Sequence, residues 1–186
     1  ITAFALVLAA CSSSSNRKLP AYEKPIARSR FQNVRTTAYT HTESDHLAYG
    51  NKSALGTPLR TGQINSAAAD WARWPAGTVF RICSTGELYQ VDDYGWALTG
   101  RNTIDLYKPS RRSMNAWGLR YEKIEVIRWG DPWASYRKMK PVAKYEHIAQ
   151  MMRDIRRFYG SPSSTPAPQP SIVAVSAPPP RVVGVQ

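Results

Sequence analysis

The chain has 186 residues, a formal net charge of +12 and 42% hydrophobic residues, enough for one domain of ordinary size with flanking segments. The charge first suggests a nucleic-acid partner, but residues 36–130 hold eleven basic and nine acidic side chains. The excess lies in residues 1–35, with six basic and one acidic, and 131–186, with eight and three. The central segment is therefore nearly balanced in charge, which argues against nucleic-acid binding. Basic flanks can be explained by non-specific attraction to an anionic surface.

The first eleven residues resemble the end of a bacterial lipoprotein signal. An apolar run from Ala3 to Ala10 is followed by Cys11 and then by four serines, and the run is too short to span a bilayer. The resemblance implies cleavage before Cys11 and lipidation of that residue, with further residues expected before Ile1. An ordinary secretory signal with an incidental cysteine is the alternative.

The next segment, residues 12–33, carries Ser, Asn, Pro and scattered basic residues without periodicity, which predicts a flexible tether. Clusters of β-branched and aromatic residues then predict strands through a central domain at 34–130. The strands are expected at 34–40, 78–83, 87–93, 102–107 and 123–129, with a hairpin turn at 84–86. A polar, glycine-dotted loop at 41–65 is suited to lining a groove.

A short helix is predicted after Pro109, with Ser110 as N-cap and Gly118 as its C-terminal stop. In the strand that follows, Ile124 and Val126 share the inward face while Ile127 faces out. Cys83 ends a predicted strand, where a small buried thiol is its expected role. These short strands, crossing loops and one small helix predict a small all-β domain of the closed-barrel type.

The region 131–160 is predicted to contain a helix that begins near Pro141. Its apolar side chains recur at helical spacing, so we expect the helix to pack on the barrel, with a membrane-surface role as the alternative. Those side chains are Val142, Tyr145, Ile148, Met152, Ile155 and Phe158. Residues 161–186 are dominated by Pro, Ser, Ala and Val, which indicates a disordered, Pro-rich tail.

Three aspartates stand in separate short motifs of the central domain. They are Asp70 in Ala-Ala-Asp-Trp, Asp93 in Val-Asp-Asp-Tyr-Gly and Asp105 in Thr-Ile-Asp-Leu-Tyr. A carboxyl that protonates a bridging oxygen must be held in place and poorly solvated, and neighbouring carboxylates raise its proton affinity. Three such groups at strand ends indicate an acid catalyst for sugar bonds.

The ordered set of motifs resembles the three-aspartate (3D) domain, found in the membrane-bound lytic murein transglycosylase A family and in stationary-phase survival muralytic proteins. The motifs span roughly residues 35–130. They are Thr37-Ala38-Tyr39-Thr40, Ala69-Asp70, Pro75-x-Gly77-Thr78, Asp93-x-Gly95, Gly100, Ile104-Asp105-Leu106-Tyr107 and Trp117-Gly118. The resemblance implies a six-stranded double-psi β-barrel. Two departures are Tyr94, where the family usually has a small residue, and the lack of room for the second domain of the larger transglycosylase.

Strand parity and the resemblance both select Asp93 as the catalytic acid. If Tyr89 and Val91 face the barrel interior, Asp93 shares their side and Asp92 points outward. Gly95 would let backbone or substrate approach closely. A turn-capping role for Asp93 is the structural alternative.

The remaining candidate residues have two interpretations each. Asp70 and Asp105 would orient the proton on Asp93 or bind sugar hydroxyls, or else cap a turn and bond backbone amides. Tyr39 and Thr40 would supply a ring and a hydroxyl to a sugar, or else a buried Tyr edge.

The resemblance implies lytic transglycosylation of peptidoglycan at the bond between N-acetylmuramic acid and N-acetylglucosamine, without metal or cofactor. One residue serves as acid and then base, and the sugar's own C6 hydroxyl replaces the second carboxylate of ordinary hydrolases. The alternatives are a non-catalytic peptidoglycan-binding lipoprotein and a septal lipoprotein resembling the rare-lipoprotein-A group. His41, Asp45 and His46 suggest metal binding only weakly, and we expect a solvated loop there. By resemblance to Gram-negative lipoproteins, Ser12 after Cys11 implies a lipid-anchored protein on the periplasmic side of the outer membrane.

Overall fold

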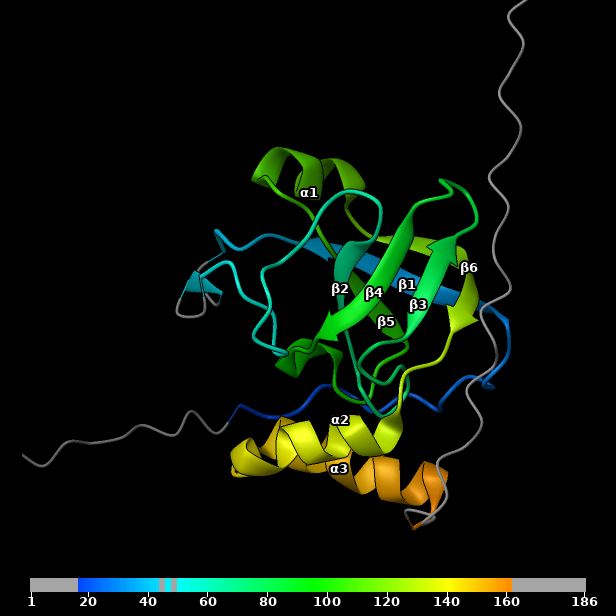
Figure 1. The fold of residues 1–186 in the computed structure, drawn as a ribbon, viewed down its shortest axis with the longest axis vertical. Helices are drawn as coiled ribbons and strands as arrows, with labels where there is room; N and C mark the ends of the chain where they lie inside the picture. The colour runs from blue at the N-terminus through cyan, green and yellow to red at the C-terminus, as the bar shows by residue number, and fades with distance from the viewer. Residues whose placement is uncertain (1–16, 44–45, 48–49, 162–186) are drawn as a thin grey trace, which may run out of the picture.

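The computed structural model describes residues 17–43, 46–47 and 50–161, and within them six strands close into a barrel (Figure 1). Neighbouring strands follow the order β1-β5-β2-β4-β3-β6, and β6 returns to β1. The strands are β1 (Phe31–Tyr39), β2 (Asn65–Ala69), β3 (Val79–Ile82), β4 (Leu88–Asp93), β5 (Thr103–Tyr107) and β6 (Arg120–Arg128). A mainly β fold with a closed six-stranded barrel is therefore confirmed.

Two of the strand pairs are parallel and the other four are antiparallel. Strand β1 runs parallel to β5 and β2 runs parallel to β4. Where a strand is regular, alternate side chains point inward and fill the barrel, because successive side chains of a strand face opposite sides. The interior holds Val34, Ala67, Phe80, Ile82, Tyr89, Val91, Ile104, Leu106, Ile124 and Val126. The inward placement of Ile124 and Val126 is as predicted, and Ile127 is 41% exposed.

The strand β2 was not predicted from the sequence. Its five residues are Asn-Ser-Ala-Ala-Ala, without a β-branched or aromatic side chain, and all five are buried. Strand propensity mainly reports how a side chain fits a half-buried surface, so it says little about a short central strand of small residues. Small side chains here allow β2 to lie between β4 and β5.

The helix α1 (Arg111–Trp117) has both of its predicted ends. The Ser110 hydroxyl accepts a hydrogen bond from the Ser113 N–H, and the Gly118 N–H donates to the Met114 carbonyl. Trp117 is buried and its indole N–H donates to the Thr36 hydroxyl over 3.2 Å. The helix is thereby fixed against β1.

The region 131–160 forms a helical layer beneath the barrel (Figure 1). It contains α2 (Pro132–Met139), the 3-10 helix η3 (Lys140–Val142) and α3 (Glu146–Tyr159). The first of these was missed, although Asp131 caps it and Pro132 occupies its first turn, which is a recognisable start signal. Pro141 lies in η3 rather than at the start of the long helix. The long helix α3 begins at Glu146, later than predicted. The apolar side of α3, including Ile148, Met151 and Ile155, is buried.

The predicted tether at 12–33 is wrong for the part that lies against the barrel. Phe31 already begins β1, and the residues before it run between the barrel and the helical layer (Figure 1). The Glu23 N–H donates to the Gly100 carbonyl over 2.8 Å, and the Asn102 N–H donates to the Glu23 carboxylate over 2.6 Å. Residues 17–33 therefore form part of the folded domain.

Cys83 differs from its prediction too. It follows β3 in the turn of the hairpin, where it is exposed and unpaired among the described residues. The predicted strand ended one residue too late, and Cys83 lies in an exposed turn. Cys11 and the tail after residue 161 lie outside the described residues.

Gly130 provides a test of the contact between β6 and the turn that precedes β3. A Cβ at Gly130 would lie 2.2 Å from the Ala76 carbonyl oxygen and 2.5 Å from that of Pro75. Backbone atoms cannot move aside cheaply, so we expect Gly130→Ala to lower the free energy of unfolding by about 2–3 kcal/mol. Urea unfolding followed by circular dichroism measures the loss.

The matched control is Gly95→Ala. An added Cβ there meets only Leu98, at 3.6 Å, and the backbone is extended with φ of −146°. We expect this substitution to change the free energy of unfolding by less than about 0.5 kcal/mol. Equal losses in the two variants would contradict the close approach at Gly130.

Candidate functional site

Four neighbouring strands bring polar side chains onto one outer face of the barrel. Thr37 on β1 is paired with Asp105 on β5. Asp105 is also paired with Ala68 on β2, and Ala68 is in turn paired with Asp93 on β4. Residues paired across a sheet point to the same face. Ala68 packs in a small cluster separate from the barrel interior, whereas Ala67 packs inside. Asp93 and Asp105 therefore share the outer face, two strand spacings or roughly 10 Å apart.

A bulge in β4 overturns the parity argument for Asp93. Ala67 is paired with Val91 but Ala68 with Asp93, so Asp92 is an extra residue in β4. A bulge breaks the alternation of side chains, and Asp93 does not share the inward side of Val91. Asp92 does point outward, but it is fully buried, where its carboxylate accepts hydrogen bonds from Ser66 and Arg60. Sequence parity could not find this bulge.

The Asp93 carboxyl is nearly buried and accepts hydrogen bonds from Ala54, Tyr94 and Tyr39. Its Oδ1 accepts the N–H groups of Ala54, over 3.0 Å, and Tyr94, over 2.9 Å. Its Oδ2 accepts the Tyr39 hydroxyl over 3.2 Å, and 7% of the residue is exposed. Burial raises the pKa of Asp93 above its ordinary value despite the two N–H groups, which lower it. The protonated carboxyl is thus favoured here more than in water.

Tyr39 belongs to a group of aromatic rings beside Asp93. Its ring lies 5.6 Å from the ring of Tyr107 in an edge-on contact and 5.6 Å from that of His46. Nδ1 of His41 lies 2.8 Å from the Tyr107 hydroxyl. Burial, followed by the charge of Asp93, holds the pKa of Tyr39 well above its ordinary value. Tyr39 thus remains a neutral phenol that donates to Asp93.

The two histidines were misjudged from the sequence. The prediction of a solvated loop at His41 and His46 is wrong, because both are half-buried against the rings of Tyr39 and Tyr107. Their closeness in sequence to the Thr-Ala-Tyr-Thr motif was the available signal. Asp45 lies outside the described residues. Among the residues that the structure describes, no group of three His, Cys, Asp or Glu side chains could hold a metal ion.

The predicted substrate-binding residues are less accessible than expected. Tyr39 is 8% exposed and Thr40 is fully buried, with its hydroxyl unpartnered among the described residues. Gly95 has extended backbone, and an added Cβ there would meet the Leu98 side chain rather than backbone, so no backbone segment approaches it closely. Tyr39 instead contacts Asp93, and its hydroxyl is the part of the motif that reaches the site.

The ring of Tyr94 is occupied by contacts to other parts of the protein. It makes an edge-on contact with Trp71, with ring centres 4.8 Å apart, and lies 6.1 Å from the ring of His147 on α3. Its backbone N–H still donates to Asp93. The ring of Tyr94 therefore connects the barrel to the helical layer, while its backbone N–H helps to hold the Asp93 carboxyl.

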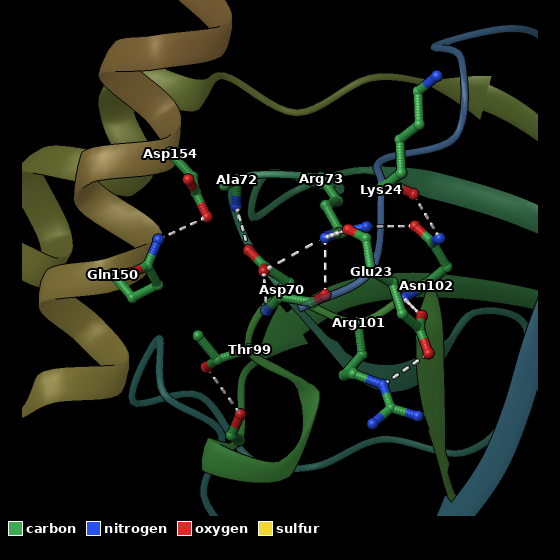
Figure 2. A network of polar contacts seen from close by, with 12 residues as sticks. Glu23, Lys24, Asp70, Ala72, Arg73, Thr99, Arg101, Asn102, Gln150 and Asp154 are labelled. Carbon is green, nitrogen blue, oxygen red and sulfur yellow. Dashed lines mark hydrogen bonds and ion pairs between the residues drawn. The ribbon is translucent and has the colours of Figure 1, made fainter. Parts of the chain in front are cut away.

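Asp70 lies in a different polar network, shown in Figure 2. Its carboxylate accepts the N–H groups of Ala72, over 2.8 Å, and Gly100, over 2.7 Å, and lies 3.6 Å from Nε of Arg73. The residue is fully buried, and each carboxylate oxygen accepts a hydrogen bond, Oδ1 from Ala72 and Oδ2 from Gly100. The structure places Asp93 and Asp105 on one outer face, and it places Asp70 in a network that connects the turn after β2 to the N-terminal segment.

Asp70 makes the stability of the fold depend on pH. Burial raises its pKa to about 6, even though Gly100, Ala72 and Arg73 lower it, and the charge of Asp154 on α3 raises it further. The folded chain then binds a proton more tightly than the unfolded chain, whose Asp has a pKa near 4. The resulting stability is complete below about pH 4 and is lost as the pH rises to about 6.

We expect Asp70→Asn to remove that dependence. The free energy of unfolding of the native chain minus that of the variant should fall by about 3 kcal/mol between pH 4 and pH 7. Urea unfolding at a series of pH values measures both proteins, and taking the difference cancels the shared contributions of Asp92 and Asp93. A difference that does not change with pH would contradict the buried, raised-pKa carboxyl.

Two cavities lie away from Asp93. One of about 170 Å³ lies between the N-terminal segment and the end of α3, and is lined in part by Ile26, Trp74 and Phe158. The other, of about 300 Å³, is lined by Leu55, Ala76, Gly77, Ala134, Ser135 and Lys138. Neither is lined by a residue of the outer-face site.

Comparison with models of protein families finds no match to this chain, and comparison with curated proteins finds none either. Among the described residues, no helix has both the length and the apolar character that crossing a membrane requires. The functional argument therefore depends on the site itself.

Proposed function

We propose that the protein cleaves the glycan strands of peptidoglycan by lytic transglycosylation, with Asp93 as the acid and base. The single observation that carries this proposal is the Asp93 carboxyl, nearly buried on the outer face of the barrel with its pKa raised by burial. A general acid must keep its proton near the working pH, and desolvation is how proteins achieve this for a carboxyl.

The hydrogen bonds of Asp93 support one location for the proton. Oδ1 accepts two backbone N–H groups, from Ala54 and Tyr94, so a proton on that oxygen would oppose two donors. Among the described residues, Oδ2 is bonded to the Tyr39 hydroxyl at 3.2 Å, and a hydroxyl can accept as well as donate. The acid form therefore carries its proton on Oδ2, and the backbone orients the carboxyl.

The proposed reaction has two proton transfers. Asp93 donates its proton to the oxygen that links N-acetylmuramic acid to N-acetylglucosamine, that bond breaks, and positive charge develops on the muramyl ring. The ionised carboxylate then takes the proton of the C6 hydroxyl on the same ring, whose oxygen bonds to the anomeric carbon. The product is a 1,6-anhydro sugar, and the proton count of the enzyme is restored. The sugar supplies the nucleophile, so a second catalytic carboxylate is unnecessary.

Asp105 is proposed to act on the substrate from the neighbouring strand. Its carboxylate accepts the Thr37 hydroxyl over 2.7 Å and shares the outer face with Asp93. The Asp105 carboxylate is half-buried and lies roughly 10 Å from Asp93, two strand spacings away. It can therefore accept hydrogen bonds from hydroxyls of a sugar bound at Asp93. Asp70 has no part in the proposed chemistry, because its carboxylate is enclosed by its own network.

The double-psi topology, the lipid anchor and the replacement at Tyr94 belong to the same proposal. Two parallel pairs in a closed six-stranded barrel are in keeping with a double-psi topology. Lipidation at Cys11 would tether the domain to a membrane, on the outer membrane's periplasmic side, within reach of the cell wall. The contacts of Tyr94 with Trp71 and His147 supply a reason for the family's usual small residue to be replaced here.

The test is product analysis. The full chain carrying Cys11→Ser, so that no lipid is attached, is incubated with purified peptidoglycan and the soluble products are examined by mass spectrometry. We expect muropeptides with 1,6-anhydro ends. Products with reducing ends would mean that water is the nucleophile, and the absence of soluble products would reject cleavage.

The burial of Tyr39 and Thr40 favours a second candidate, a non-catalytic peptidoglycan-binding lipoprotein. With both residues almost fully buried and Asp93 only 7% exposed, a sugar would contact the rim of the site rather than its acid. Binding to peptidoglycan without release of any product distinguishes this candidate from the enzyme.

A further inference from the structure

The outer face of β1 and β6 carries exposed aromatic and basic side chains that the proposed chemistry does not use. Phe31 is 49% exposed and Tyr121 is 78% exposed. Register places Phe31 opposite Glu125, Asn33 opposite Lys123 and Arg35 opposite Tyr121. We name this surface the β1–β6 strip, made of Phe31, Asn33, Arg35, Arg81, Tyr121, Lys123 and Glu125.

The strip is positively charged even after its internal pairs are counted. Its one carboxylate, Glu125, is 9% exposed and already bonded to Arg81, over 3.2 Å, and to Arg30, over 2.6 Å. The ammonium of Lys123 lies 4.9 Å from the Phe31 ring centre. The strip holds three basic side chains against this one carboxylate, and Arg30 adds a fourth positive charge beside it. A surface of this kind attracts an anionic partner.

The spacing of the two rings fits an extended partner. Phe31 and Tyr121 are four residue positions apart along the antiparallel pair, or roughly 13 Å. Two exposed rings spaced along a charged face can anchor one extended partner, since aromatic anchors often contribute most of the affinity of an interface. A single small molecule would not reach both rings.

The strip is continuous with the outer-face site. Phe31, Asn33, Arg35, Thr37 and Tyr39 alternate along β1, so their side chains share one face of that strand. Arg35 bonds to Thr103, and the next outward residue, Thr37, bonds to Asp105. From Phe31 to Tyr39 the row extends roughly 27 Å. One extended polymer lying along β1 would therefore contact both the strip and the site.

We propose that the β1–β6 strip binds an anionic glycan strand and leads it toward Asp93. This inference rests on the proposed function for the identity of the polymer, whose muramyl and peptide portions carry carboxylates. The rings of Phe31 and Tyr121 contact sugar faces, while Lys123 and Arg35 pair with the carboxylates. Binding at the strip does not require cleavage, so the two proposals fail separately.

The experiment measures co-sedimentation with purified peptidoglycan at physiological salt. The full chain carries Cys11→Ser and Asp93→Asn, so that the polymer is not consumed. We expect Phe31→Ser with Lys123→Gln to weaken binding about tenfold. Tyr121→Ala, which removes a ring without changing charge, should weaken it in the same direction.

The chain contains a matched control. Tyr145 in the helical layer is 50% exposed, and the Lys144 ammonium lies 5.2 Å from its ring centre. Tyr145→Ser with Lys144→Gln likewise removes one exposed ring and one positive charge, and should leave binding unaltered. Equal loss in both double variants, or no loss in the strip variants, would overturn the proposal. Loss of binding to phosphatidylglycerol vesicles but not to peptidoglycan would identify a lipid surface instead and also overturn it.

Discussion

Replacing Asp93 by Asn should lower the rate of anhydro-muropeptide release by about three orders of magnitude, the middle of the range for losing a general acid. Asn keeps the shape of the side chain and can still accept the N–H groups of Ala54 and Tyr94 through its oxygen. It cannot donate a proton to the leaving oxygen. The measurement is the initial rate of product release from labelled peptidoglycan, with the fold of the variant checked by circular dichroism.

Asp92→Asn is the matched control, because it makes the same chemical change one residue earlier at a fully buried position. Asp92 bonds to Ser66 and Arg60 rather than to Tyr39. We expect this variant to retain its activity within about threefold, a difference below 1 kcal/mol. Equal loss in both variants would show that a buried negative charge in the bulge matters, rather than the acid itself.

Arg73→Met should lower the free energy of unfolding at pH 7 by about 3–5 kcal/mol. The Arg73 guanidinium lies 3.6 Å from Asp70, bonds to the Asn102 side chain and donates to the carbonyls of Glu23, over 2.5 Å, and Gly100, over 2.7 Å (Figure 2). Met fills similar space but leaves a buried carboxylate without its cation. Urea unfolding measures the loss.

The loss caused by Arg73→Met should shrink below about pH 6, because Asp70 then binds a proton and no longer needs a cation. The control is Arg153→Met. Its partner Glu146 is 62% exposed, so the pair contributes less than about 1 kcal/mol. Equal and small losses for both variants would contradict a structural role for the Arg73 network.

Elements with local sequence signals, such as helix caps and turn residues, were predicted from the sequence. The Ser110 cap and the Gly118 stop fixed α1, and the Ser-Thr-Gly turn fixed the hairpin of β3 and β4. The strand β2 could not be predicted in this way, because its alanines have no strong strand preference of their own. They form a strand because small side chains fit the space between β4 and β5. The N-terminal segment escaped prediction for a related reason: Glu23 is held by groups nearly eighty residues away.

The site was predicted in part. The sequence identified Asp93 and Asp105, which share an outer face, but it grouped Asp70 with them. Motif order cannot show that Asp70 turns toward Gly100 and Arg73 instead. The outward placement of Asp93 depends on the bulge at Asp92, which only the pairing with β2 reveals.

The most direct measurement of the central claim is the titration of the Asp93 carboxyl, followed by carbon-13 NMR and assigned by the signal that Asp93→Asn removes. Burial should hold its pKa above the ordinary aspartate value of 3.8, so we predict a midpoint clearly above that value. A midpoint at or below 3.8 would mean that Asp93 has lost its proton at neutral pH, and it would contradict a role for this residue as the acid that cleaves glycan.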